Sequence, residues 1–165
     1  MQPTQKDMDE FRRHLRRGSI QKAYGALLSY MMGLRTHFHD RYPKSSVSGL
    51  YQGYLDMSYF AIVPPSFKRR GLKIAIVFNY GAFRFEAWLA AANRQIQRKY
   101  WKLLSDVPLA GYRLVTPAPG IDSIIECDLA DHFDFQHFDA LTAQIEAKAA
   151  KFTNDMERVL SRCAR

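Results

Sequence analysis

The chain has 165 residues, with 24 Lys and Arg against 16 Asp and Glu, a formal net charge of +8 and 47% hydrophobic residues. This length and mix are typical of one folded domain and exclude a disordered chain, so we treat residues 1–165 as a single domain. No apolar run reaches the length of about 18 residues that a membrane helix needs, and the N-terminus does not resemble a secretory signal. We therefore expect a cytoplasmic protein without a membrane-spanning segment.

The charges are distributed unevenly along the chain. Residues 1–120 contain 19 Lys and Arg against 7 Asp and Glu, whereas residues 121–165 contain 5 against 9. A basic body with an acidic end portion would attract polyanions to one surface, although a moderate net charge also serves solubility.

Two helices are expected at the N-terminus. The first runs from about Thr4 to Gly18, and its four arginines lie opposite an apolar stripe of Met8, Phe11 and Leu15. The second is capped by Ser19 and ends before Pro43. Its apolar residues recur at steps of three and four, which predicts a helix that faces the core.

Aromatic and β-branched residues then indicate extended chain. Residues 51–63 end at two prolines, and residues 72–79 and 83–89 alternate between apolar and polar side chains. Tyr80 and Gly81 are typical of a tight turn between the last two segments. The three segments together predict an antiparallel meander of three strands.

A basic helix follows the third strand. Asn93 is typical of a helix N-cap, and Ile96, Tyr100 and Leu103 are expected to face the core, with Leu104 as a further candidate. Residues 111–117 and 121–129 then predict a short and a longer strand on either side of a Pro/Gly turn. A last helix, from about residue 134 to about residue 161, would be about 40 Å long, enough to project or to dimerise.

These elements predict an α+β domain with two N-terminal helices, a mainly antiparallel sheet of about five strands and a long C-terminal helix on one face. The order helix, three-strand meander, helix, strand is also that of a restriction-endonuclease-like α/β core, which is the alternative fold. Such nucleases hold a metal ion with an acidic residue and an acidic-x-Lys triplet on adjacent strands. Here the triplet is Glu86-Ala87-Trp88, in which Trp88 replaces the lysine, and Asp56 would supply the second acid.

Three stretches of the chain resemble a family of small bacterial proteins that is described as an uncharacterised domain of unknown function. They are YQGYLDMSYF, LKIAIVFN and RFEAWLAAANRQIQRKYW, and the resemblance runs from the second helix through IDSIIE. It implies a bacterial, cytoplasmic context and brings no activity, cofactor or catalytic residue with it.

The basic helix carries the residues that we single out as a binding surface for an anionic partner: Arg94, Gln97, Arg98, Lys99, Trp101 and Lys102. Arg and Lys bind phosphates, Gln reads base edges, and exposed aromatic rings stack on unpaired bases. The same composition also describes an amphipathic surface helix whose aromatic residues pack on the sheet while its cations reach into water.

A second candidate site centres on Trp88, a large aromatic side chain among the charged residues of its strand. Together with it, five residues would line a concave pocket of polar and aromatic side chains: Tyr54, Asp56, Lys73, Asn79 and Glu86. The alternative is that a helix covers Trp88 and that the carboxylates are cross-strand partners of cations.

No metal site and no cofactor are predicted. His37 and His39 point to different sides of a helix, and acids at a helix N-terminus explain the cluster around His132 and His137. Cys127 and Cys163 have no ligand spacing, and the chain contains no phosphate-binding loop and no GxSxG motif.

The sequence therefore favours a non-catalytic binding module whose basic helix contacts an anionic partner, with nucleic acid as the first candidate. One alternative is a metal-dependent nuclease-like or other small-substrate enzyme that uses Asp56 and Glu86. Another is a protein-interaction module that forms a homodimer through its C-terminal helix.

Overall fold

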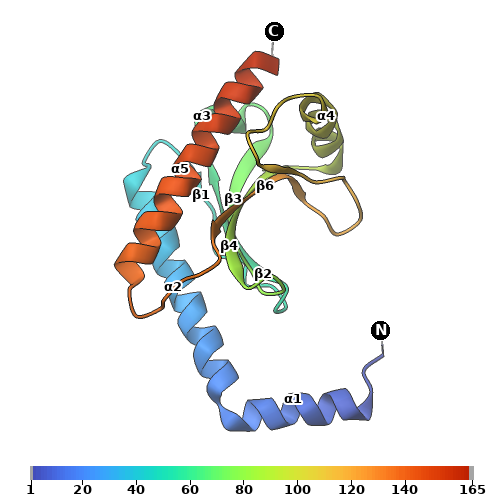
Figure 1. Ribbon diagram of the computed structural model, residues 1–165, viewed down its shortest axis with the longest axis vertical. Helices are drawn as coiled ribbons and strands as arrows, with labels where there is room; N and C mark the ends of the chain where they lie inside the picture. Colours follow the sequence, from blue (N-terminus) through green and yellow to red (C-terminus); the bar gives the residue numbers. More distant parts are fainter. Residues whose placement is uncertain (1, 164–165) are drawn as a thin grey trace.

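The computed structural model describes residues 2–163 and confirms the predicted α+β architecture (Figure 1). Two helices, α1 (Gln5–Arg17) and α2 (Ser19–Arg41), precede the sheet, and the long helix α5 (Phe138–Cys163) follows it. Between them lie β1 (Ser46–Val47), β2 (Met57–Val63), α3 (Pro65–Lys68), β3 (Leu72–Asn79), β4 (Arg84–Ala91), α4 (Arg94–Ser105), β5 (Arg113–Leu114) and β6 (Ser123–Ala130).

The sheet has six strands in the order β1-β2-β3-β4-β6-β5, and every neighbouring pair is antiparallel. β2, β3 and β4 form the predicted meander, in which Val77 pairs with both Tyr59 and Glu86. Helix α4 then connects β4 to β6, which pairs with the free edge of β4. This connection places α4 and the chain after it at one end of the sheet.

Helices α2 and α5 cover one face of the sheet (Figure 1). The predicted alternation of β3 and β4 is confirmed for seven apolar residues that are buried on this face: Leu72, Ile74, Ile76, Phe78, Phe85, Ala87 and Leu89. Phe83 does not follow the prediction, because it lies in the turn before β4, where it is exposed. The buried stripe of α5 consists of Leu141, Ile145, Ala149, Phe152, Met156 and Leu160. Helix α5 therefore uses its apolar stripe within its own chain, against the sheet.

The first long strand is shorter than predicted. Only residues 57–63 form β2, and Tyr51 makes an isolated bridge to Tyr59. The intervening chain turns back on itself, since Gly53 and Leu55 both have positive φ angles. The carboxylate of Asp56 stabilises this turn by accepting a hydrogen bond from the backbone N–H of Tyr54 at 2.8 Å.

Helix α4 differs from the prediction in the residues that it buries. Asn93 is its N-cap as expected, and Tyr100 and Leu104 face the core, but Leu103 is exposed and Gln97 is buried in its place. The buried positions 97, 100 and 104 follow the helical repeat. The polar side chain of Gln97 is tolerated inside because its amide finds hydrogen-bond partners there.

Helix α1 stands away from the rest of the domain (Figure 1). None of its residues is buried, and it meets α2 at a corner formed by Gly18, whose φ of 74° is left-handed. Glycine suits this corner because it adopts positive φ without a steric penalty. Among residues 2–163, no helix has the length and apolar character that crossing a membrane would require.

Candidate functional site

The position of α4 is set at its first turn. The side chain of Asn93 accepts a hydrogen bond from the N–H of Ile96 at 2.9 Å, which satisfies one of the free donors of the helix start. Ile96 in turn lies against Gly71, where a Cβ atom would come within 2.6 Å of its Cδ1. The close approach of these two residues brings the turn before β3 beside the start of α4.

Arg94 and Gln97 attach the loop before β6 to α4. The amide nitrogen of Gln97 donates to the carbonyl oxygens of Ile121 and Ser123, at 2.9 and 3.1 Å. The guanidinium of Arg94 donates to the side-chain oxygen of Gln97 at 2.9 Å and to the carbonyl of Ile121, and it lies 3.4 Å from a carboxylate oxygen of Asp122. The structure thus gives these two predicted site residues internal partners, and they position the loop.

Arg98, Lys99 and Lys102 remain exposed on the outer side of α4. Within the described chain, the pair of Arg94 with Asp122 is the one ion pair that involves this helix. Asp106, the acid nearest to these cations in sequence, caps the end of α4 and lies within ion-pair distance of none of them. Three uncompensated cations therefore project from two turns of one helix.

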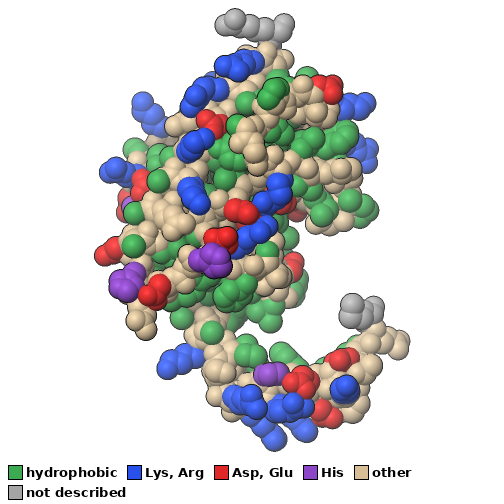
Figure 2. All heavy atoms as spheres, viewed as in Figure 1, with side chains coloured by type: hydrophobic (Ala, Val, Ile, Leu, Met, Phe, Trp, Pro, Cys, Tyr) green, Lys and Arg blue, Asp and Glu red, His purple; other side chains and the backbone are tan. Residues whose placement is uncertain are grey.

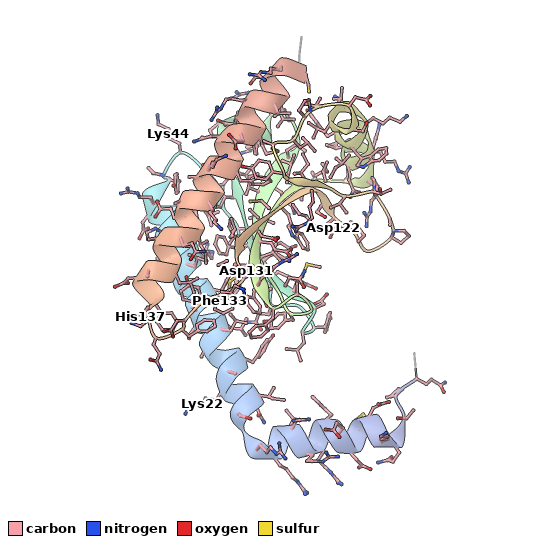
Figure 3. All side chains as sticks on the ribbon, viewed as in Figure 1. Lys22, Lys44, Asp122, Asp131, Phe133 and His137 are labelled. Carbon is pink, nitrogen blue, oxygen red and sulfur yellow. The ribbon has the colours of Figure 1, made fainter. Side chains whose placement is uncertain are left out.

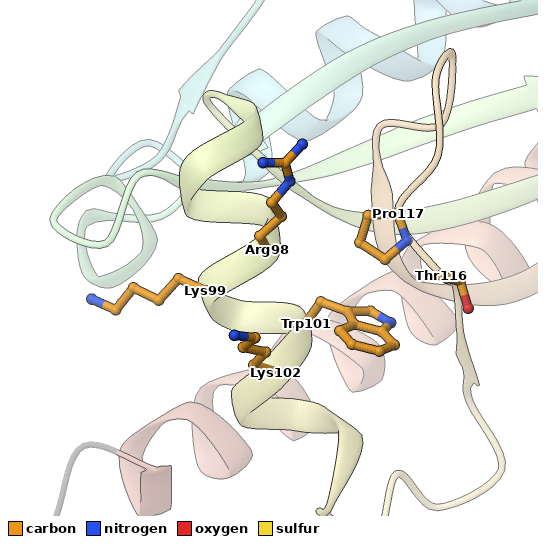
Figure 4. Close-up of a pocket in the computed structure, with 6 residues that line it drawn as sticks. All are labelled: Arg98, Lys99, Trp101, Lys102, Thr116 and Pro117. Carbon is orange, nitrogen blue, oxygen red and sulfur yellow. The ribbon is translucent and has the colours of Figure 1, made fainter.

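A groove separates α4 from the loop of residues 116–120 (Figure 4). One part, of about 410 Å³, is lined by Arg98, Lys99, Trp101, Lys102, Thr116 and Pro117. A second part, of about 430 Å³, is lined by Arg94, Gln97, Arg98 and residues 117–120. Arg98 and Pro117 belong to both parts, so the two hollows adjoin each other along the groove beside the cations.

The half-buried ring of Trp101 forms part of the groove wall and points toward Thr116 and Pro117, whereas Lys99 points away from that loop (Figure 4). The indole N–H of Trp101 is buried and has no hydrogen-bond partner among the described residues. Packing alone therefore holds the ring in the wall. Its orientation leaves an aromatic surface next to the cationic side of the helix.

Further cations lie at the same end of the molecule. Lys68 and Arg69 are exposed in the turn that precedes Gly71, and Gly71 contacts Ile96 on α4. Lys99 is three residues beyond Ile96, so it lies on the side of α4 that faces this turn. The basic surface thus extends from the groove across α4 to the turn before β3. We call this set of exposed cations the basic end: Lys68, Arg69, Arg98, Lys99 and Lys102.

The open face of the sheet brings together three of the predicted pocket residues. Lys73, Glu86 and Trp88 share this face, and Lys73 and Trp88 line a recess of only about 20 Å³, too small for a substrate. Tyr54 is exposed in the loop before β2, and Asn79 binds the N–H of Ala82 in the β3–β4 turn. These residues do not form a common cavity.

Asp56 and Glu86 lie too far apart to share a metal ion. Asp56 lies three residues before Tyr59, which aligns with Glu86 across β3. At a strand spacing of about 4.8 Å and a rise of about 3.3 Å per residue, their Cα atoms are separated by about 14 Å. Moreover, residues 2–163 contain no group of three or more His, Cys, Asp or Glu side chains that could hold a metal ion.

Comparison with known proteins assigns the chain to a family. The sequence model of a family described as "Domain of unknown function (DUF7000)" matches residues 4–160. The chain belongs to this family. No curated protein and no solved structure gives a significant match. The predicted resemblance to a family of unknown function is thereby confirmed for DUF7000, whereas the bacterial context stays a prediction.

This DUF7000 chain also carries a charged network that sequence reasoning missed. On the open face, Arg113 of β5 lies 2.8 Å from Asp128, 3.4 Å from Glu126 and 3.9 Å from Glu86. Arg84 joins the network at 2.6 Å from Glu86. The pair of Arg84 with Glu86 is local to β4, whereas the contacts of Arg113 depend on the register of β4, β5 and β6, and no local pattern in the sequence signals them. Burial meanwhile raises the pKa of the neighbouring Cys127 thiol, which disfavours a thiolate nucleophile there.

Proposed function

We propose that the protein binds an anionic partner through the basic end and the groove beside α4, and that nucleic acid is this partner. The observation that carries the proposal is the absence of ion pairs for Arg98, Lys99 and Lys102 among the described residues. Cations without acidic neighbours are free to contact phosphates, and they release counterions when they do so.

The groove supports contact with a phosphate backbone. Its walls are cationic on the α4 side and formed by Thr116 and Pro117 on the other side. A backbone that follows the groove would pass Arg98 in both of its parts, with the ring of Trp101 beside it. Phosphate contacts of this kind give affinity without sequence preference, because the groove presents few side chains that read base edges. Gln97 does not serve that role, since its amide is used internally.

A salt titration tests the proposal. Fluorescence anisotropy of a labelled oligonucleotide, as a single strand and as a duplex, would give the dissociation constant between about 50 and about 300 mM NaCl. We expect the affinity to fall steeply with salt. In the triple variant Arg98→Ala, Lys99→Ala, Lys102→Ala, the slope of log K against log salt should decrease by about 2 to 3, the value for three lost phosphate contacts.

A matched variant controls for net charge. Lys22, Lys44 and Lys148 are also exposed, and Figure 3 shows Lys22 and Lys44 far from α4. Their replacement by Ala removes the same three charges from other surfaces, and we expect the slope to stay near that of the wild-type protein. No binding at low salt, or an equal loss in both triple variants, would contradict a specific role for the basic end.

A further inference from the structure

Helix α1 presents an apolar face that no other part of residues 2–163 covers. Met8 is 49% exposed and Phe11 is 51% exposed, although both lie on the stripe that a core-facing helix would bury. In Figure 2, hydrophobic side chains line the side of α1 that faces the body of the molecule, and Lys and Arg side chains line the opposite side. Open space separates this apolar face from the body.

An apolar groove lies across that space. It has a volume of about 520 Å³ and is lined by the first turns of α2, the loop before β2, the β3–β4 turn and the chain after β6. The lining residues include Ile20, Tyr24, Leu27, Leu55, Phe83 and Phe133. Figure 3 shows Phe133 at the end of the body that faces α1. The ring of Phe83 is stacked on that of Phe133 at a centroid distance of 6.0 Å. Within the part of the chain that the structure describes, the groove is therefore a second apolar surface that no segment covers.

Two residues at the rim of this groove are held in unfavourable backbone conformations. Leu55 has a φ of 62° and Phe83 a φ of 51°, and their exposed fractions are 51% and 62%. Bulky L-residues rarely adopt positive φ, and glycine or asparagine would relieve the cost. In a single chain, the backbone conformation of these two residues and the exposure of their apolar side chains are thus both unfavourable. This is consistent with a surface that is covered in an assembly.

The α1 helix of the same chain cannot fill the groove. Gly18 is the one residue between α1 and α2, whereas antiparallel helices that pack on each other need a connection of about two to five residues. The corner is also fixed by hydrogen bonds, because the N–H of Gly18 and the side-chain amide of Gln21 both donate to the carbonyl of Leu15. An α1 helix can therefore reach such a groove only from another molecule.

The charge pattern of α1 favours a second copy of itself as its neighbour. Residues 5–10 contain one Lys and three acids, whereas residues 11–17 contain four Arg and no acid. When two α1 helices align antiparallel, the acidic half of each lies beside the basic half of the other, and their helix dipoles also oppose. An antiparallel pair of identical helices is the arrangement that a two-fold axis generates.

We infer that the protein forms a two-fold symmetric homodimer in which the α1 helix of each copy inserts into the space between α1 and the apolar groove of the other. The apolar faces of the two α1 helices, with Met8 and Phe11, then pack against each other, and the opposite side of each inserted helix lies along the groove of the other copy, where the aliphatic stems of its arginines contact the aromatic wall. This interface is independent of the proposed nucleic-acid binding, because it uses no residue of the basic end.

The oligomeric mass of the full chain tests the inference. Light scattering coupled to size-exclusion chromatography should give twice the chain mass of 19.1 kDa for the wild-type protein. Phe11→Asp in α1 and Phe83→Asn at the groove rim should each weaken the dimer at least about 30-fold. Neither change should unfold the body, since α1 buries no residue and asparagine tolerates the positive φ of Phe83. Met32→Asp, at an exposed position of α2 outside the groove, should leave the mass unchanged.

Cross-linking between two preparations locates the interface. In a background without Cys127 and Cys163, one chain carries Phe11→Cys and a second, mass-tagged chain carries Phe83→Cys. A short bismaleimide should give a mixed dimer of the two chains. A monomer at all concentrations, a dimer that persists in both interface variants, or a monomer that binds anionic lipid vesicles through α1 would each overturn the inference.

Discussion

Trp88 donates its indole N–H to the carboxylate of Glu86, two residues earlier on the same face of β4, with an Nε1 to Oε2 distance of 2.7 Å. The other carboxylate oxygen accepts from the Nε of Arg84 at 2.6 Å, and the side chain of Glu86 is only 1% exposed. A buried carboxylate is costly unless it is paired and hydrogen-bonded, and here both oxygens have partners. Trp88 thus shields a structural ion pair and does not line an open pocket.

Replacement of Glu86 should therefore destabilise the fold. Glu86→Ala leaves the indole N–H and one side of Arg84 without partners, and we expect a loss of about 2 kcal/mol in the free energy of unfolding. Trp88→Phe keeps most of the ring but removes one hydrogen bond, so about 1 kcal/mol should be lost. Urea denaturation of both variants checks the ranking. If Glu86→Ala unfolds at the wild-type urea midpoint, the network does not stabilise the sheet.

Acid should weaken the contact between α2 and α5. His37 lies 2.5 Å from the carboxylate of Glu146, Tyr42 donates to the same carboxylate at 3.1 Å, and Arg41 lies 3.3 Å away. The hydrogen bond with His37 is the main cause that lowers the pKa of Glu146. Because the pKa is lower in the folded state, this stabilisation is complete above the usual Glu pKa of about 4.3 and is lost as the pH falls through the folded value.

The variant Glu146→Gln isolates this contribution. Near neutral pH it should be less stable than the wild-type protein by about 1.5 kcal/mol, the lower end of the range for hydrogen bonds to a charged group. The difference should shrink below about pH 5 and vanish once the wild-type carboxylate is protonated. Urea unfolding of both proteins across this range measures it. A difference that is constant with pH would show that the carboxylate charge has no part in the contact.

A substitution at Gly71 would test how closely α4 packs against the turn before β3. The φ of Gly71 is 69°, and a Cβ atom would meet the Cδ1 of Ile96 at 2.6 Å. Gly71→Ala should therefore cost about 1 kcal/mol for the backbone and a smaller amount for the displaced side chain. The double variant Gly71→Ala, Ile96→Val lacks the clashing methyl group, and thermal unfolding should show a coupling energy between the two sites. If the stability losses of Gly71→Ala and Ile96→Val simply add in the double variant, then the clash with the Cδ1 of Ile96 does not contribute to the cost.

Local patterns in the sequence predicted the strands and the start of α4, because alternation and an Asn cap depend on neighbouring residues alone. The burial of Gln97 was not predicted, since it depends on the carbonyls of Ile121 and Ser123, which lie more than 20 residues along the chain. The same limit applies to Arg113 and Asp128, which strand register brings together. Such partners are visible only after the fold is known.

Amphipathic patterns have a related limit. Both α1 and α5 carry an apolar stripe in the sequence, and such a stripe does not say what it packs against. In the structure α5 lies on the sheet, whereas Met8 and Phe11 of α1 stay exposed. The difference arises from Gly18, which turns α1 away from the body. Among residues 2–163, the apolar stripe of α1 thus stays uncovered, whereas that of the longer α5 is buried.

A substitution at Arg94 can show whether nucleic-acid binding depends on the shape of the groove as well as on its positive charge. The guanidinium of Arg94 bonds the loop before β6 through Gln97, the carbonyl of Ile121 and Asp122. Lysine has a single ammonium group and cannot reproduce this set of directed donors, whereas it replaces arginine well as a point charge toward phosphate. Arg94→Lys should therefore increase hydrogen exchange in residues 116–122 and weaken oligonucleotide binding.

Arg98→Lys is the matched comparison on the same helix, because Arg98 has no partner within the described chain. It should keep the affinity within about threefold of wild type and leave both the exchange of the loop and the salt slope unchanged. For Arg94→Lys the net charge is also conserved, so any loss of affinity reports the geometry of the groove. Equal affinities for the two variants, with the loop loosened only in Arg94→Lys, would show that the cations bind without the groove.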